Sequence, residues 1–208
     1  MFDYPNLVKT LNQFAELSKT TPLTLGEALD SLDKAGYAFI ALILVLPFLQ
    51  PLPMGPITVI GGVAFATLGW QLFNRHESPV LPSKIRNVEF SEKTWRILVN
   101  VCLKVLNVCR KLTKHRYPRI VNGARGQKIG GGILLAAGVL MAIPFGVLPF
   151  NNLLPGLAIL FYSIGELESD GLMFFIAIFW LIVTVAYFTA FFVALWFFGQ
   201  EALEFFKL

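Results

Sequence analysis

The sequence has 208 residues, of which 56% are hydrophobic and only 14% charged, and its formal net charge is +4. Soluble domains carry about 25% charged residues, and the mean hydropathy of this chain is +0.67. The composition excludes an ordinary soluble domain and predicts an all-α integral membrane protein. We expect membrane lipids as its partners and no nucleic acid.

Residues 1–34 are polar and are predicted to form amphipathic helices. The segment MFDYPNLVKTLNQFAELSKT lacks the basic start, the continuous apolar core and the cleavage site of a signal peptide. Thr24 and Glu27 have the spacing of a capping box, which indicates the start of a second helix. Helical spacing predicts an apolar face on the first helix, made by Leu7, Leu11, Phe14 and Ala15.

Residues 35–73 are predicted to form a broken helical hairpin. The stretch LPFLQPLPMGP (46–56) holds four prolines in eleven residues, and prolines end a helix. The helical arms on either side, 38–46 and 57–73, reach only about 14 Å and about 26 Å, against a hydrocarbon core of about 30 Å. The break therefore indicates a re-entrant hairpin, and a kinked loop at the membrane surface is the alternative.

The same pattern returns later in the chain and predicts a second broken hairpin at 130–170. The segment LPFLQPLPMGPITVIGGVAFATLG (46–69) resembles IPFGVLPFNNLLPGLAILFYSIG (143–165), and each copy carries polar side chains in its break. Those side chains are Gln50, Asn151 and Asn152, and the break prolines are Pro47, Pro51, Pro53, Pro144 and Pro155. Unpaired backbone groups are costly in lipid. We therefore expect the two breaks to meet within the membrane around a polar site, as in many transporters.

The central segment 74–129 is basic and is predicted to be cytoplasmic. It holds 13 of the 17 Lys and Arg residues and three Glu, a balance of 13 − 3 = +10. Basic residues mark the cytoplasmic side, and this surface would also attract anionic lipid head groups. A helix over 95–112 has a polar stripe and is predicted to lie in the membrane interface, although it could equally pack against the other membrane helices. The segment GARGQKIGGG (123–132) does not have the order of a P-loop, and its glycines predict a flexible lead-in to a helix at 133.

No catalytic motif, metal-ligand spacing or cofactor signature stands out, so we expect neither enzyme activity nor a bound cofactor or metal. Cys102 and Cys109 lie seven residues apart on a predicted helix, with Cα atoms about 10 Å apart. This separation is too large for a disulfide, and both are expected to be free thiols.

The acidic segment GELESDG (165–171) precedes a C-terminal part, 171–208, whose residues 171–198 carry no charge and are predicted to cross the membrane. The segment is either a solvated turn or the place where a carboxylate faces a cavity and binds a proton or a cation. We expect Asp170 to cap the last helix and Glu168 to be the functional carboxylate. Asn at 170 should preserve function, whereas Gln at 168 should abolish it. Gln71 follows the first copy much as Glu168 follows the second.

An ordered set of motifs runs through the chain from about residue 24 to 190, namely LGEALDSLDKAG, LPFLQPLPMGP, ATLGWQL, SPVLP and LPGLAILFYSIGELESDGL. In this ordered set the sequence resembles the ExoD-like exopolysaccharide synthesis proteins of bacteria. Val80 departs from the pattern, because members often have Trp before Leu-Pro. The residues that match by pattern are Pro47, Pro51, Pro53, Gln71, Pro144, Asn152, Pro155, Glu168, Asp170 and Gly171.

The resemblance implies a multi-pass protein of the bacterial inner membrane, connected with exopolysaccharide production and with tolerance of alkaline conditions. The broken-hairpin plan is also similar to that of DedA-type membrane proteins, in architecture alone.

Three functions are compatible with these patterns. The first is a small transporter or an ion or lipid translocator, with substrate or ion bound by Gln50, Gln71, Asn151, Asn152, Glu168 and Asp170. The second is a non-catalytic accessory subunit that works with exopolysaccharide machinery or as a homo-oligomer. The third is a membrane enzyme that acts on a lipid-linked sugar, which the lack of an acid/base pair disfavours.

Overall fold

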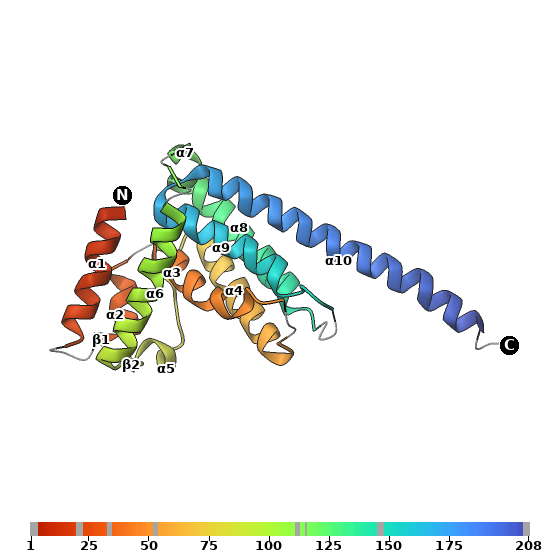
Figure 1. Cartoon of the computed structure of the whole chain (residues 1–208), viewed down its shortest axis with the longest axis horizontal. Coiled ribbons are helices and arrows are strands. Elements are labelled where there is room, and N and C mark those ends of the chain that lie inside the picture. The colour runs from red at the N-terminus through yellow and green to blue at the C-terminus, as the bar shows by residue number, and fades with distance from the viewer. Residues whose placement is uncertain are drawn as a thin grey trace.

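The computed structural model describes residues 4–19, 23–32, 35–51, 54–110, 113–114, 116–144 and 148–205. The fold is helical, which confirms the all-α prediction (Figure 1). Its helices are α1 (Tyr4–Leu17), α2 (Leu25–Asp30), α3 (Ala35–Val45), the 3-10 turn η1 (Leu46–Phe48), α4 (Pro56–Phe73), α5 (Ser83–Arg86), α6 (Glu92–Arg110), α7 (Pro118–Val121), α8 (Gly123–Ala142), α9 (Leu153–Glu168) and α10 (Gly171–Phe205). Two short strands, β1 (Leu23–Thr24) and β2 (Glu89–Phe90), pair antiparallel.

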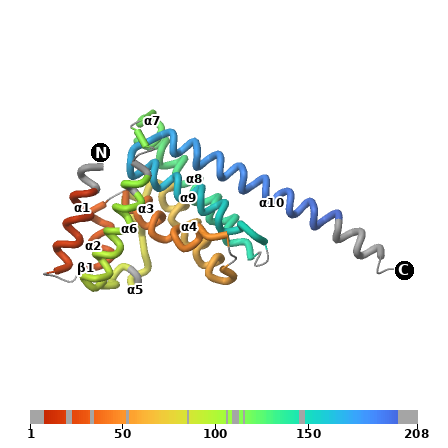
Figure 2. The backbone as a smooth tube through the Cα atoms, in the orientation of Figure 1, coloured from red at the N-terminus to blue at the C-terminus, as the bar shows by residue number. Residues whose placement is uncertain are grey.

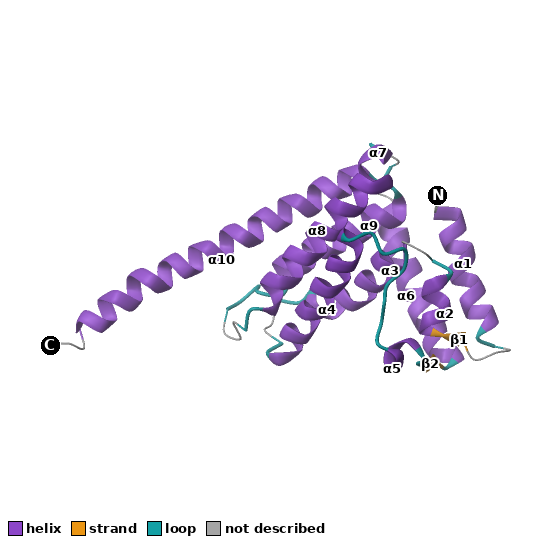
Figure 3. Cartoon of the chain, turned by 180° about the vertical axis from the view of Figure 1, so that it is seen from behind, coloured by secondary structure: helices purple, strands orange, loops and turns teal. Residues whose placement is uncertain are grey.

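Helices α3, α4, α8, α9 and α10 form the central bundle. α4 lies along α8, α3 lies along α9, and α10 packs against α9 and α8 (Figures 1 and 3). Gly62, near the start of α4, approaches Ala142 at the end of α8, and Gly69 approaches Leu135. The two helices are therefore antiparallel, so the break before α4 and the break after α8 lie at the same end of the bundle.

Glycines let the backbones of α4 and α8 touch. A Cβ atom built on Gly69 would lie 2.2 Å from the Leu135 nitrogen, and one on Gly131 would lie 2.5 Å from the Phe73 nitrogen. Gly62 and Gly138 meet the backbone of the partner helix in the same way, both at 2.4 Å. Small residues of this kind are the usual device for close helix packing in membranes.

The glycine-rich segment 123–132 is not a flexible lead-in, and this prediction was wrong. It forms the first half of α8, which begins at Gly123. Its glycines serve close approaches, because Gly131 faces the backbone of Phe73 and Gly130 lies under the ring of Tyr162. Packing of the helix on two neighbours offsets the entropy that glycine loses in a helix.

The N-terminal helices α1 and α2 come together with α5, β2 and α6 of the central basic segment beside the bundle (Figure 1). The ring of Trp95 on α6 lies 5.6 Å from Phe14 of α1 and 5.4 Å from Phe90 of β2. Its indole nitrogen donates to the Leu23 carbonyl over 3.1 Å. Leu11 and Phe14 are buried, which confirms the apolar face of the first helix within its described side chains. The predicted capping box at Thr24 is also present.

Helix α6 packs against α1. Trp95, Val99 and Cys102 form its buried stripe. Lys104 and Asn107 are exposed, as the polar stripe predicts. Three apolar residues that would face lipid or a partner helix are also exposed, namely Ile97, Val101 and Val108.

We expect Cys102 to be chemically inert in the folded protein. Burial raises the pKa of its thiol to about 12, and only the thiolate reacts with a maleimide. With Cys109 replaced by Ser, labelling of Cys102 at pH 8 should be at least about a hundredfold slower in the folded chain than in the unfolded one. The labelling rate, measured by mass spectrometry, checks this, and equal rates would contradict it.

The raised pKa of the Cys102 thiol also makes stability depend on pH. Because the folded pKa of Cys102 lies above the unfolded value of about 8.5, the contribution of the protonated thiol is complete below that pH. It is lost progressively as the pH rises toward 12.

Among the described residues, two helices are long and apolar enough to cross a membrane, Pro56–Phe73 and Gly171–Phe197. Only about a third of each is buried within the chain. Their outer faces carry Ile57, Ile60 and Val63 on α4 and a row of large apolar residues on α10. α10 also continues past the bundle (Figure 2). A bilayer would cover such faces.

Candidate functional site

The first break packs against the helix that follows it. α3 ends at Val45, and the turn η1 follows with Pro47 inside it. The ring of Phe48 packs on α4, where it lies 6.1 Å from the ring of Phe65 and close to Gly61. This contact explains why Pro-Phe opens the break, since the proline ends the helix and the phenylalanine anchors the turn.

The two breaks lie close together, as their shared pattern predicts. A Cβ atom built on Gly156, in the first turn of α9, would lie 3.6 Å from the Phe48 carbonyl oxygen and 3.5 Å from Leu49 Cδ2. The second break is also tied to α10, because the Tyr187 hydroxyl donates to the Pro149 carbonyl over 2.6 Å. The bundle thus brings residues about a hundred positions apart to one end.

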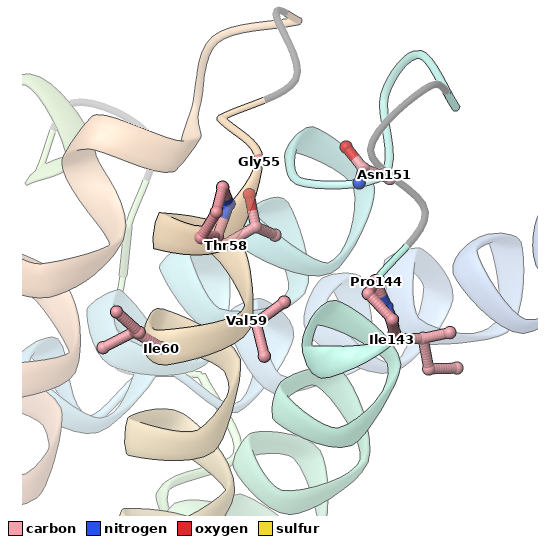
Figure 4. A pocket seen from close by; sticks show the side chains of 8 residues that line it. Gly55, Thr58, Val59, Ile60, Ile143, Pro144 and Asn151 are labelled. Atoms are coloured by element: carbon pink, nitrogen blue, oxygen red, sulfur yellow. The ribbon is translucent and has the colours of Figure 1, made fainter.

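A pocket of ≈ 470 Å³ lies where the two breaks meet (Figure 4). The first turns of α4 form one wall, and residues of the second break form the other. Its polar side chains are Thr58 and Asn151, both buried. The lining residues are Gly55, Pro56, Thr58, Val59, Ile60, Ile143, Pro144 and Asn151.

The polar break residues differ in their surroundings. Asn151 lines the pocket and is 4% exposed, and Asn152, at 1%, takes the N-cap position of α9. Gln50 is exposed on the other break. Of the polar residues predicted in the breaks, Asn151 lines the pocket, and Asn152 follows it in the chain.

The prolines also divide into two kinds. Pro47, Pro51 and Pro144 lie in the breaks and are exposed, and Pro53 is outside the described residues. Pro155 is buried in the first turn of α9. A proline there breaks nothing, because the first N–H groups of a helix have no intrahelical partner.

Gln71 holds a loop in place at the last turn of α4. Its amide donates to the Val80 carbonyl over 3.0 Å and accepts from the Val80 nitrogen over 2.8 Å. The Tyr37 hydroxyl on α3 donates to the Ser78 carbonyl over 2.9 Å. Both contacts fix the SPVLP loop to the bundle, so the geometry supports a structural role for Gln71.

Asp170 caps α10, as predicted, and also binds a distant loop. One carboxylate oxygen accepts from the Leu172 nitrogen over 3.0 Å, and the other accepts from the Lys114 nitrogen over 2.9 Å. The Gly171 nitrogen donates to the Arg116 carbonyl over 2.7 Å. The start of α10 is therefore locked onto the segment that links α6 to α7.

The six candidate polar residues do not form one site. Glu168 is buried in the last turn of α9, and Asp170 follows it. The pocket lies beyond the first turn of the same helix, roughly 20 Å away by helical rise. Gln71 likewise lies at the end of α4 away from the pocket. The functional role of Glu168 stays a prediction, and the structure places that residue apart from the two breaks.

Sequence reasoning missed Thr58. It lies in the first turn of α4, directly after the break, with a buried side chain that lines the pocket. The available signal was a lone hydroxyl in the apolar run PITVIGG. Within the described part of the chain, no three His, Cys, Asp or Glu side chains cluster in a way that would hold a metal ion.

Comparisons with known proteins agree with the sequence motifs. The sequence model of the family "Exopolysaccharide synthesis, ExoD" matches residues 7–190. The chain is 29% identical over 204 residues to "Protein ExoD" of Rhizobium meliloti (strain 1021), covering 97% of this chain and 83% of that protein. No solved structure matches the chain. The family match spans most of the sequence, and we conclude that the chain belongs to the ExoD family of exopolysaccharide synthesis proteins.

Proposed function

We propose that this protein is a multi-pass protein of the bacterial inner membrane that binds and translocates a small molecule or ion needed for exopolysaccharide production. The observation that carries the proposal is the pocket built jointly by the two chain breaks. Irregular backbone at membrane depth is stable only where protein or a water-filled cavity surrounds it. Paired breaks around a shared pocket are the arrangement that transporters use to bind substrate.

The lengths of the helices support a pocket inside the bilayer. From the exposed Lys128 to Ala142, α8 rises about 21 Å, less than the hydrocarbon thickness of about 30 Å. With the basic segment 74–129 at the cytoplasmic surface, the pocket would lie in the far half of the membrane. The apolar outer faces of α4 and α10 would then contact lipid.

Blocking the pocket should remove function without removing the protein. Val59 lines the pocket, and tryptophan at this position would fill part of it. We expect the Val59→Trp strain to make as little exopolysaccharide as a deletion strain, with normal amounts of protein in the membrane. Exopolysaccharide yield, growth at alkaline pH and immunoblotting of membranes check this.

The matched control is Val63→Trp, one turn further along α4. Val63 is 54% exposed and lies outside the pocket. A tryptophan side chain at this position should therefore extend into lipid and leave the exopolysaccharide yield normal. Normal yield from the Val59→Trp strain would overturn the proposal, and so would equal losses from both variants.

A further inference from the structure

We infer that the pocket between the two breaks takes an amphiphilic anion, with a phosphate group at the start of α4 and an apolar chain along the pocket wall. This inference rests on the proposed function and names the substrate class of that same site. Three features of the pocket carry it, which are a helix start without a side-chain cap, a buried hydroxyl and an apolar lining.

The first feature is the start of α4, an 18-residue helix that begins at the pocket. Gly55 precedes it with a positive φ of 58°, Pro56 is its first residue, and no side chain caps it. The N-terminal end of a helix carries a partial positive charge and N–H groups that lack intrahelical partners. Such an end is a ready anion site. α9 also starts at the breaks without a side-chain cap.

The second feature is Thr58, which is independent of the helix dipole. Its side chain is 2% exposed, it lines the pocket, and its hydroxyl has no hydrogen-bond partner among the described residues. By contrast, the hydroxyls of Thr67 and Thr184 donate to carbonyls one turn earlier, over 2.8 Å and 2.7 Å. A buried hydroxyl without a partner is costly. A phosphate oxygen in the pocket would accept its hydrogen bond.

Thr58 also points in the right direction for this role. Its side chain projects from the first turn of α4 on the side of the second break, where Asn151 lies (Figure 4). A group bound between them would contact the hydroxyl, an asparagine amide and the helix end together. An amide can donate to an anionic oxygen, as a hydroxyl can.

The third feature is the rest of the lining. None of the described residues that line the pocket carries a charge, and most are apolar, with Val59 and Ile143 among them. A free phosphate ion would gain nothing from these walls, whereas a hydrocarbon chain would be sheltered by them. The chemistry therefore favours a phosphate carried on a lipid over inorganic phosphate.

Binding to purified protein in a neutral detergent tests the inference with three probes. Farnesyl phosphate has both the charge and the chain, farnesol has the chain alone, and inorganic phosphate has the charge alone. We expect farnesyl phosphate to bind at least about tenfold more tightly than either of the other two. Isothermal titration gives the affinities, and the rise in melting temperature gives an independent readout.

Three variants on the same helix test the site itself. Thr58→Val keeps the shape of the side chain and removes its hydroxyl, and it should weaken the binding of farnesyl phosphate about tenfold. Thr58→Ser keeps the hydroxyl and should bind as the wild type does. Thr67→Val, at an exposed position of α4, should also bind normally.

Equal binding of farnesol and farnesyl phosphate would overturn the anion assignment, and equal binding of inorganic phosphate would overturn the lipid assignment. Unchanged binding by Thr58→Val would overturn the site. If Val59→Trp abolishes exopolysaccharide while farnesyl phosphate fails to bind the wild type, the proposed function stands and this inference alone is wrong.

Discussion

Valine in place of Gly131 is expected to prevent α4 and α8 from packing and to lower the amount of folded protein sharply. A Cβ atom at this position would lie 2.5 Å from the Phe73 nitrogen and 2.8 Å from its Cα atom. These are backbone atoms of the neighbouring helix, so they cannot move aside as a side chain would. Overpacking costs about 1–3 kcal/mol where side chains can adjust, and more where they cannot. We expect the melting temperature in detergent to fall by about 10 °C or more.

The adjacent glycine supplies the control. A Cβ atom on Gly132 would meet nothing within 4 Å, although it lies in the same helix and the same local sequence. Gly132→Val should therefore keep the melting temperature within a few degrees of the wild type. If both variants were equally stable, the close approach of α4 and α8 would be refuted.

Alanine in place of Asp170 is expected to destabilise the protein by about 2–4 kcal/mol. The side chain is fully buried, and its two oxygens accept hydrogen bonds from the backbone nitrogens of Lys114 and Leu172. Loss of a cap costs about 1 kcal/mol, and a buried N–H left without a partner costs about 1–3 kcal/mol. Thermal unfolding of purified variants measures the effect.

The stability of the Asp170→Asn protein should lie between that of the wild type and that of Asp170→Ala. The single side-chain oxygen of asparagine can accept from Leu172 or from Lys114, while its amide group cannot replace the second acceptor. Helix capping alone predicts that Asn preserves function, and the contact with Lys114 adds an expected loss of stability. Asp30→Ala is the matched control, since Asp30 is an exposed partner of Arg86 and such pairs contribute less than about 1 kcal/mol. An Asp170→Asn protein as stable as the wild type would show that the Lys114 contact is dispensable.

The sequence by itself determined the features that depend on composition and on near neighbours. Its apolar blocks indicated the helical class, Thr24 and Glu27 located a helix start, and Asp170 located another. The prolines located both breaks, because a proline beyond the first turn removes a helix hydrogen bond and its ring clashes with the preceding turn. The shared Pro-Phe pattern also predicted that the breaks would meet, since broken backbone must be shielded.

Only the tertiary structure decided how distant segments contact one another. The glycines of 123–132 suggest flexibility when taken alone, yet Gly131 is helical and the backbone of Phe73 fits against it. Trp95 joins α6 to α1, because Phe14 and the Leu23 carbonyl complete its surroundings. Thr58 lines a pocket only because residues of the second break form the opposite wall. Each of these depends on a partner far along the chain, and local propensity carries no information about such partners.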